Sequence, residues 1–286
     1  MATSLKHSFL KQKTKLLDLI HDWSDFYHND YDDYDDDFLI EDISDSIYDK
    51  LREVNNYPAI GNSPGLISFS RDLSKPFEKK SRVNISLARF VRRNLKITSD
   101  EICDSNLEIF ETLFKFKQLS NTELVKQIKV LKGKDLVAFY ATTKAGSCMT
   151  GKAQSNYIKF YGNNPTKVSL ITYKNEARAL LWKTKKGKFY IDRVYSTSVI
   201  GSYIIRKYAK LKKYNSCWSD YDDINSVNED YVEMKPTDKY PCLDSFSFGR
   251  LDKKENIIYL QTGPRNYFSA NVELCCTNGG LNTYYD

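Results

Sequence analysis

The first half of the chain shows apolar residues at the three-and-four spacing that is typical of amphipathic helices. The clearest stripe runs through residues 39–54 and contains Leu39 or Ile40, Ile43, Ile47, Leu51 and Val54. The breakers that follow this stripe predict a loop; they are Pro58, Gly61, Pro64 and Gly65. The pattern therefore indicates a helix over residues 39–54 and irregular backbone after it.

Further helices are predicted between residues 83 and 131. Val83–Leu95 has an apolar face and an arginine-rich back. Thr98 with Glu101, and Ser120 with Glu123, have the spacing of capping boxes. Each pair precedes an apolar stripe, the second one including Leu124, Ile128 and Leu131. We expect residues 1–135 to form a helical lobe with an acidic loop.

The second half changes to the shorter period of β-strands. Three runs rich in β-branched and aromatic residues, 168–173, 177–183 and 188–195, are separated by short polar links, which predicts an antiparallel meander. A helix with an apolar stripe from Ile200 to Leu211 follows, and the tail contains short strands at 256–261 and 271–275. Residues 136–286 are therefore predicted to form an α+β lobe, and the fold class of the chain is α+β.

Composition excludes several classes of protein. The 286 residues are 41% hydrophobic and contain no apolar run long enough to span a bilayer, so we expect no membrane association. The basic N-terminus lacks the continuous apolar core of a signal peptide. The six cysteines form no C-x-x-C pair, and all three histidines precede residue 29, so we predict reduced thiols and no metal site.

Charge is segregated along the chain. Residues 30–37 contain an acidic patch of Asp30, Asp32, Asp33, Asp35, Asp36 and Asp37. Residues 71–96 hold nine Lys and Arg against two acids, a net of +7, and residues 206–213 add five cations. Such asymmetry predicts a dipolar surface that steers partners or drives acidic-to-basic self-association.

The stretch KAGSCMTGKAQ, residues 144–154, admits three interpretations. Gly146, Gly151 and Lys152 have the spacing of a Walker A loop, and Asp192 ends an apolar run as a Walker B acid does. Ala153, however, replaces the hydroxyl that would hold Mg²⁺, and no βαβ alternation surrounds the motif. A degenerate nucleotide-binding enzyme stays an alternative, but we favour a structural turn and predict no cofactor.

Two further chemical interpretations concern a thiol and the aspartates. Cys148 as a nucleophile needs a base and a lowered pKa, and a histidine base would have to come from the distant N-terminal lobe. We therefore favour a half-buried cysteine in a turn. The aspartate run matches an EF-hand loop at four positions but has Asp35 where the loop requires glycine, so we interpret it as a solvated acidic loop.

A basic patch offers a nucleic-acid hypothesis. Its members are Lys79, Lys80, Arg82, Arg89, Arg92 and Arg93. These side chains could contact phosphates, or they could form the solvated face of an amphipathic helix or pair with the aspartates. No helix-turn-helix, RRM or zinc module accompanies them in the sequence.

Blocks in the C-terminal half resemble an uncharacterised family of phage-encoded proteins. They are Ser147-Cys148-Met149, Tyr161 with Asn164-Pro165, Arg178–Trp182, Asp192-Arg193 with Tyr195, Tyr240-Pro241 with Asp244 and Phe246, and Thr277 with Gly279-Gly280. The resemblance implies a phage protein that acts in the host cytoplasm, and it brings no established activity or catalytic residues.

The order of elements is also similar, more loosely, to acetyl-CoA-dependent N-acetyltransferases. In that family an antiparallel meander runs into a helix whose N-terminus holds a pyrophosphate. Here residues 168–195 run into Thr197–Ser202 and a helix, but the first cation and first glycine of the family's loop are missing. A degenerate acetyltransferase-like enzyme is therefore an alternative.

The blocks also suggest one connected network of side chains. Its candidate members are Ser147, Cys148, Lys152, Arg178, Asp192, Arg193 and Asp244. Bidentate pairing of the arginines with the aspartates would fix the strand register or anchor a ligand. We name no catalytic residue.

From the sequence we expect a protein that acts by binding. The charge segregation and Tyr-rich segments suit protein interfaces, where Tyr and Arg supply anchors. Together with the phage resemblance, they predict a protein that inhibits or redirects a host protein or complex. The alternatives kept open are nucleic-acid binding and a degenerate acetyltransferase-like or nucleotide-binding enzyme. Homo-oligomerisation through acidic-to-basic contact is compatible with the main prediction.

Overall fold

The computed structural model describes residues 2–23, 34–146 and 149–216, and, in the tail, residues 231–235, 239–240, 249–252, 257–260 and 273–274. The chain divides into two compact units, residues 1–124 and 125–286. The division expected from the sequence, between residues 135 and 136, lies later, within helix α6 (Gly133–Thr142).

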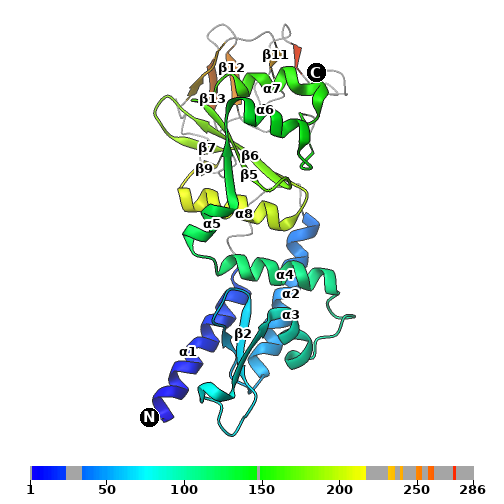
Figure 1. Cartoon of the computed structure of the whole chain (residues 1–286), viewed down its shortest axis with the longest axis vertical. Helices are drawn as coiled ribbons and strands as arrows, with labels where there is room; N and C mark the ends of the chain where they lie inside the picture. Colours follow the sequence, from blue (N-terminus) through cyan, green and yellow to red (C-terminus); the bar gives the residue numbers. More distant parts are fainter. Residues whose placement is uncertain are drawn as a thin grey trace, which may run out of the picture. The chain divides into compact units, whose positions relative to one another are not determined.

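The N-terminal unit combines helices with a small sheet. Its elements are α1 (Ala2–His21), α2 (Tyr34–Glu53), β1 (Ala59–Ile60), β2 (Leu66–Ser70), η1 (Lys79–Ser81), β3 (Arg82–Ser86), α3 (Leu87–Phe90), the π-helical turn η2 (Val91–Leu95), α4 (Asp104–Lys117) and most of α5 (Asn121–Gln127). Helices α1 and α2 lie side by side (Figure 1). The predicted stripe of α2 is confirmed, because Ile40, Ile43, Ile47 and Leu51 are all buried.

The small sheet corrects two predictions. Strands β1, β2 and β3 pair in this order and antiparallel, where the sequence predicted a loop followed by a helix from Val83. Gly65 lies at the start of β2 with a φ of +85°, a conformation that favours glycine. The helix begins only at Leu87, where the hydroxyl of Ser86 accepts a hydrogen bond from the Arg89 amide. The breakers therefore mark turns of a hairpin.

Both predicted capping boxes form. The Glu101 carboxylate accepts hydrogen bonds from the amide and the hydroxyl of Thr98, at 2.7 and 3.1 Å. Glu123 does the same for Ser120, at 2.9 and 2.6 Å. The first box closes a separate turn, because α4 begins only at Asp104. The second starts α5, which ends at Gln127 and is followed by a strand instead of the predicted helix to Leu131.

The C-terminal unit is built around a sheet of six strands. These are β4 (Ile128–Leu131), β5 (Val168–Tyr173), β6 (Ala177–Lys183), β7 (Phe189–Ile191), β8 (Tyr195–Ser196) and β9 (Asn215–Ser216). The order is β4-β5-β6-β7-β9, with β8 paired to β6. The predicted antiparallel meander is confirmed by the pairing of β5, β6 and β7, whereas β9 joins β7 in parallel. The fold class α+β is thus confirmed.

Helices cover both faces of this sheet (Figure 1). The predicted helix after the meander is α8 (Val199–Lys212); it packs on one face, where a Cβ at Gly201 would come within 2.7 Å of the Ala177 Cβ. Helices α6 and α7 (Ser155–Gly162) pack on the other face. Gly162 lets these two helices approach closely, since a Cβ there would lie 2.5 Å from a methyl of Val137.

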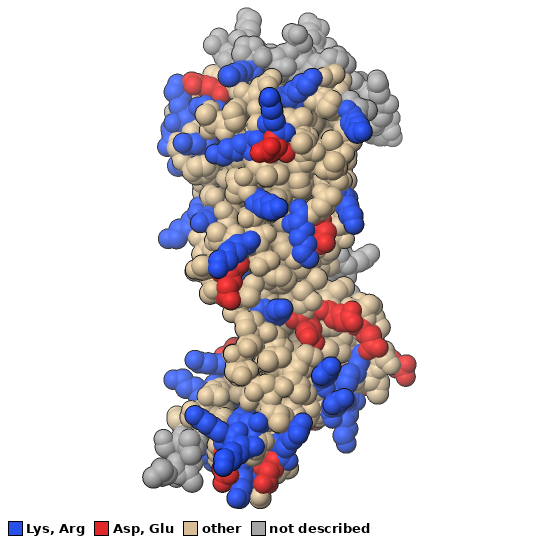
Figure 2. Space-filling view, in the orientation of Figure 1, with Lys and Arg blue, Asp and Glu red and all other residues tan. Residues whose placement is uncertain are grey.

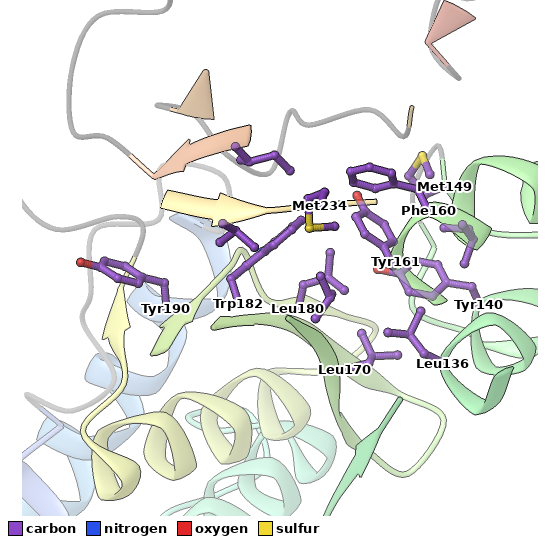
Figure 3. Close-up of a cluster of buried hydrophobic side chains, with 14 residues drawn as sticks. Leu136, Tyr140, Met149, Phe160, Tyr161, Leu170, Leu180, Trp182, Tyr190 and Met234 are labelled. Atoms are coloured by element: carbon purple, nitrogen blue, oxygen red, sulfur yellow. The ribbon is translucent and has the colours of Figure 1, made fainter. Parts of the chain in front are cut away.

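The core between α6, α7 and the sheet is aromatic. Figure 3 shows Leu170, Leu180 and Trp182 pointing from the sheet toward Tyr140, Phe160 and Tyr161 of the helices. The rings of Tyr161 and Trp182 meet edge to face, with centroids 5.7 Å apart. Val232, Met234 and Ile258 close the cluster; they belong to or adjoin β10 (Tyr231–Glu233) and β13 (Ile257–Leu260), which pair antiparallel.

The tail contains three further short strands. They are β11 (Lys239–Tyr240), β12 (Gly249–Asp252) and β14 (Glu273–Leu274). Strand β12 pairs with β13 antiparallel, and β11 pairs with β14 in parallel. The two tail strands predicted at residues 256–261 and 271–275 correspond to β13 and β14.

Candidate functional site

The glycine stretch 144–154 joins two helices. Helix α6 ends at Thr142, and the 3₁₀ turn η3 (Lys152–Gln154) leads into α7. The Walker A geometry needs a strand before the loop, and here a helix precedes it. Gly151 has a φ of +101°, and its amide donates to the carbonyl of Tyr140 at 3.1 Å. The Lys152 side chain is exposed, while Ser147 and Cys148 lie outside the described residues.

The loop is held to the sheet by a buried arginine. Arg178 of β6 is 1% exposed, and its Nε donates to the carbonyl of Ala145 at 3.2 Å. Its guanidinium lies between the rings of Tyr140 and Tyr195, with Cζ 4.3 and 4.4 Å from the two centroids. Two of the resembling blocks, Arg178–Trp182 and the segment ending at Tyr195, therefore meet beside the glycine loop.

Asp192 is held by different partners. It is 2% exposed; one carboxylate oxygen accepts from the Trp182 indole at 3.2 Å, and the other accepts from the Arg193 amide at 2.7 Å. The Arg193 guanidinium lies 5.7 Å from the centroid of Tyr195. Asp244 lies outside the described residues. Arg178 and Asp192 thus contribute to packing around the aromatic core, and their bidentate pairing stays a prediction.

The Asn164-Pro165 block has a structural role. The Asn164 side chain donates to the carbonyl of Phe160 at 2.7 Å and accepts from the amide of Lys235 at 2.8 Å. It therefore ties the end of α7 to the segment after β10. With Tyr161 in the core, this block supports the fold of the C-terminal unit.

The basic patch predicted in the N-terminal unit divides into two groups. Arg82 donates to the carbonyls of Tyr57 and Ser68 and to the Ser68 hydroxyl, and burial lowers its pKa. Arg92 donates to three carbonyls and pairs with Asp104 at 2.6 Å. These two side chains hold turns together. The exposed members, which can meet a partner, are Lys79, Lys80, Arg89 and Arg93.

The acidic segment is partly helical. Asp35, Asp36 and Asp37 belong to the first turn of α2, which corrects the prediction of an acidic loop through residue 37. Asp30, Asp32 and Asp33 lie outside the described residues.

The largest excess of positive charge lies in the C-terminal unit. The prediction from the sequence placed the basic patch at residues 71–96 and noted only the five cations of residues 206–213 in this unit. Residues 125–216 contain 20 Lys and Arg against 3 Asp and Glu, a net of +17. The complete unit, residues 125–286, has 26 against 15, a net of +11, while residues 1–124 have 17 against 22, a net of −5. Figure 2 shows Lys and Arg spread over the visible face of the C-terminal unit, with few acids between them.

Two groups of lysines frame one edge of the large sheet. Lys183, Lys185, Lys186 and Lys188 crowd the hairpin between β6 and β7, whose turn is closed by Thr184 and Lys188 at 2.9 Å. Lys185 pairs with Glu233 at 2.6 Å, which raises the pKa of Lys185 and lowers that of Glu233. Lys210, Lys212 and Lys213 surround the C-terminus of α8. The parallel pairing of β7 with β9 brings this helix end beside β7.

The helix N-terminus that suggested an acetyltransferase is capped from within the chain. The Ser198 hydroxyl accepts from the Gly201 amide at 3.1 Å, and the Ser196 hydroxyl donates to the Ser198 carbonyl at 2.6 Å. The close approach of Gly201 to β6 explains why glycine stands there. Both features have a structural explanation without a bound pyrophosphate.

Comparison with protein-family models, with curated proteins and with solved structures finds no match. The chain is thus defined by its own geometry as an α+β protein of two units, and both resemblances stay predictions. Within the described part of the chain, no helix is long and apolar enough to cross a membrane. The same residues contain no group of three His, Cys, Asp or Glu side chains placed to hold a metal ion.

Proposed function

We propose that the C-terminal unit binds nucleic acid through its basic surface. The net charge of +17 over residues 125–216 is the observation that carries this proposal. Even if every acid of the unit neutralised one cation, 11 positive charges would remain. Such an excess destabilises the folded state by self-repulsion. A polyanionic partner relieves that repulsion, because phosphates replace the missing acids and release their condensed counterions.

The packing of α8 favours nucleic acid over an anionic membrane as the partner. A helix that lies on a membrane needs a free apolar face to insert between the lipids. In α8 the apolar residues Ile204, Ile205 and Tyr208 are buried against the sheet. The helix therefore offers its cations to a partner but no apolar face.

A pair of charge-reversal variants tests the proposal. Lys183, Lys186 and Lys188 are changed to Glu on the β6–β7 hairpin, and Lys75, Lys79 and Lys80 are changed to Glu in the N-terminal unit as a control. All six lysines are exposed, and both variants change the net charge equally. Fluorescence anisotropy with a labelled oligonucleotide should show at least about tenfold weaker binding for the hairpin variant. The control should stay within about threefold of the wild type. Loss in the control alone would instead assign binding to the predicted basic patch.

A second candidate is the predicted contact with a host protein or complex. It is supported by exposed leucines of the N-terminal unit, Leu73 at 61% and Leu10 at 45%. The segments that carry them touch through the rings of Phe9 and Phe77, whose centroids are 5.5 Å apart. A pull-down from host lysate should yield a stoichiometric protein that is lost when Leu73 and Leu10 are changed to Asp. Retention of that protein by the variant would contradict this interface.

A further inference from the structure

An exposed aromatic ring lies between the two lysine groups of the large sheet. Phe189, the first residue of β7, is 37% exposed. Its ring contacts that of Tyr214, with centroids 5.7 Å apart, and Tyr214 in turn meets Tyr208 at 6.2 Å. These separations are those of interacting aromatic pairs. The three rings form a continuous aromatic row at the edge of the sheet.

A lysine stands at each end of this row. Lys183 pairs with Phe189 across β6 and β7, and its Nζ lies 5.9 Å from the Phe189 ring centroid. Lys212 lies 5.6 Å from the ring centroid of Tyr208. We define the aromatic row as these five residues, from Lys183 through Phe189, Tyr214 and Tyr208 to Lys212.

The backbone fixes the row in place. Strand β9 pairs with β7 in parallel, with Asn215 opposite Tyr190. The Asn215 side chain also donates to the carbonyl of Phe189 at 3.1 Å. The amide of Tyr214 donates to the carbonyl of Ala209 and so closes the end of α8. The exposed ring is therefore carried by backbone that is hydrogen-bonded on both sides, to β9 and through β9 to the end of α8.

The row carries no negative charge of its own. Burial raises the pKa of Tyr214 to about 12, and the neighbouring Tyr208 contributes to the same shift. The phenol thus stays protonated in neutral solution and does not repel phosphate. Lysines at a helix C-terminus also stabilise the helix dipole, so charge alone does not define a site here. The site is defined by the solvent-exposed ring of Phe189, which lies between the two lysine groups.

We propose that this row binds single-stranded nucleic acid, with a base stacked on Phe189 and the flanking phosphates against the lysines. This inference rests on the proposed function and specifies its ligand. Proteins that bind single strands without sequence preference combine a basic surface with exposed aromatic rings, on which bases stack. In duplex DNA the bases already stack on each other, so a duplex offers the Phe189 ring no base to stack on. Only the lysines then contribute to binding, through their charge.

Matched variants separate stacking from charge. Phe189→Ala removes the ring, and Phe189→Trp keeps an aromatic face at the same position. Val130→Ala is the control, because Val130 is 43% exposed on β4, at the opposite edge of the same sheet. Circular dichroism and the melting temperature establish that each variant is folded.

The experiment measures anisotropy with a single-stranded oligonucleotide, an abasic oligonucleotide of the same length, and a duplex. We expect Phe189→Ala to bind the single strand at least about fivefold more weakly. Its affinity for the abasic strand should stay unchanged. Phe189→Trp should retain binding, with quenching of its fluorescence, and Val130→Ala should match the wild type.

Two results overturn the inference in different ways. If the wild type binds all three ligands equally and Phe189→Ala changes none of them, the aromatic row has no stacking role, while nucleic-acid binding itself stands. If the wild type binds none of the three ligands at low salt, the proposed function fails and the inference fails with it.

Discussion

The guanidinium of Arg178 lies over the ring of Tyr140, and its Nη1 donates to the phenol oxygen of the same residue at 3.0 Å. This contact connects β6 to α6 and places the glycine stretch against the sheet. The planar guanidinium makes the stacking and the hydrogen bonds at the same time, which a lysine cannot do. The relationship explains why a charged residue is fully buried at this position.

Replacement of Arg178 by Lys should therefore destabilise the protein. We expect the free energy of unfolding to fall by about 2 kcal/mol, because planar stacking and directed hydrogen bonds are both lost. Urea denaturation followed by circular dichroism measures the change. Arg89→Lys, at an exposed position, should stay within about 0.5 kcal/mol of the wild type. Equal stability of both variants would show that the stacking contributes nothing.

Gly201→Ala tests the packing of α8 on the sheet. The added Cβ would lie 2.7 Å from both the Ala177 Cβ and the Ser196 hydroxyl oxygen. We expect a loss of about 1–3 kcal/mol in the free energy of unfolding, which exceeds the gain in helix propensity. Ser202→Ala, the next residue of the helix, is the control. A more stable Gly201→Ala variant would mean that α8 does not approach β6 this closely.

The capping box at Thr98 predicts a pH effect. Hydrogen bonds from the Thr98 amide and hydroxyl lower the pKa of Glu101 below its ordinary value. Its contribution to stability is thus fully present above that ordinary value and is lost as the pH falls through the folded pKa. NMR titration should show this lowered pKa. In Thr98→Ala the pKa of Glu101 should rise partway toward the ordinary value, because the hydrogen bond from the backbone amide of residue 98 remains. In the control variant Ser99→Ala the pKa of Glu101 should not change. An equal pKa in wild type and Thr98→Ala would contradict the box.

Self-association is expected to depend on salt. The N-terminal unit has a net charge of −5 and the C-terminal unit +11, so opposite units of two copies attract each other. Sedimentation velocity at low ionic strength should show a concentration-dependent shift to faster species. About 0.5 M salt should abolish the shift, because the Debye length then falls well below 10 Å. A dimer that persists in high salt would require an apolar interface instead.

The large sheet was predictable because its strands are local in sequence. Strands β5 and β6 are rich in β-branched and apolar residues and are joined by a short polar turn, and the structure pairs the whole of β5 with residues 177–182 of β6. Strand β4 was not predictable, since Leu124, Ile128 and Leu131 also fit a helical stripe. Hydrogen bonding to β5 favours the strand over the helix for residues 128–131. A short apolar run alone does not show which of the two conformations tertiary contacts will stabilise.

The candidate site divides in the same way. The charge excess of residues 125–216 could be counted from the sequence alone. The cluster of lysines directly before Phe189 is also visible in the sequence. The contact of Phe189 with Tyr214 could not be predicted, because it depends on the parallel return of β9 after α8. Likewise, the sequence could not reveal that the guanidinium groups of Arg82 and Arg92 donate hydrogen bonds to backbone carbonyls.

The salt dependence of oligonucleotide binding tests the central claim most directly. The logarithm of the association constant, plotted against the logarithm of the salt concentration, should fall with a slope of about −3 or steeper. Changing Lys183, Lys186 and Lys188 to Gln should reduce that slope by about 2. A slope near zero, or the same slope in wild type and variant, would contradict binding through the basic surface of the C-terminal unit.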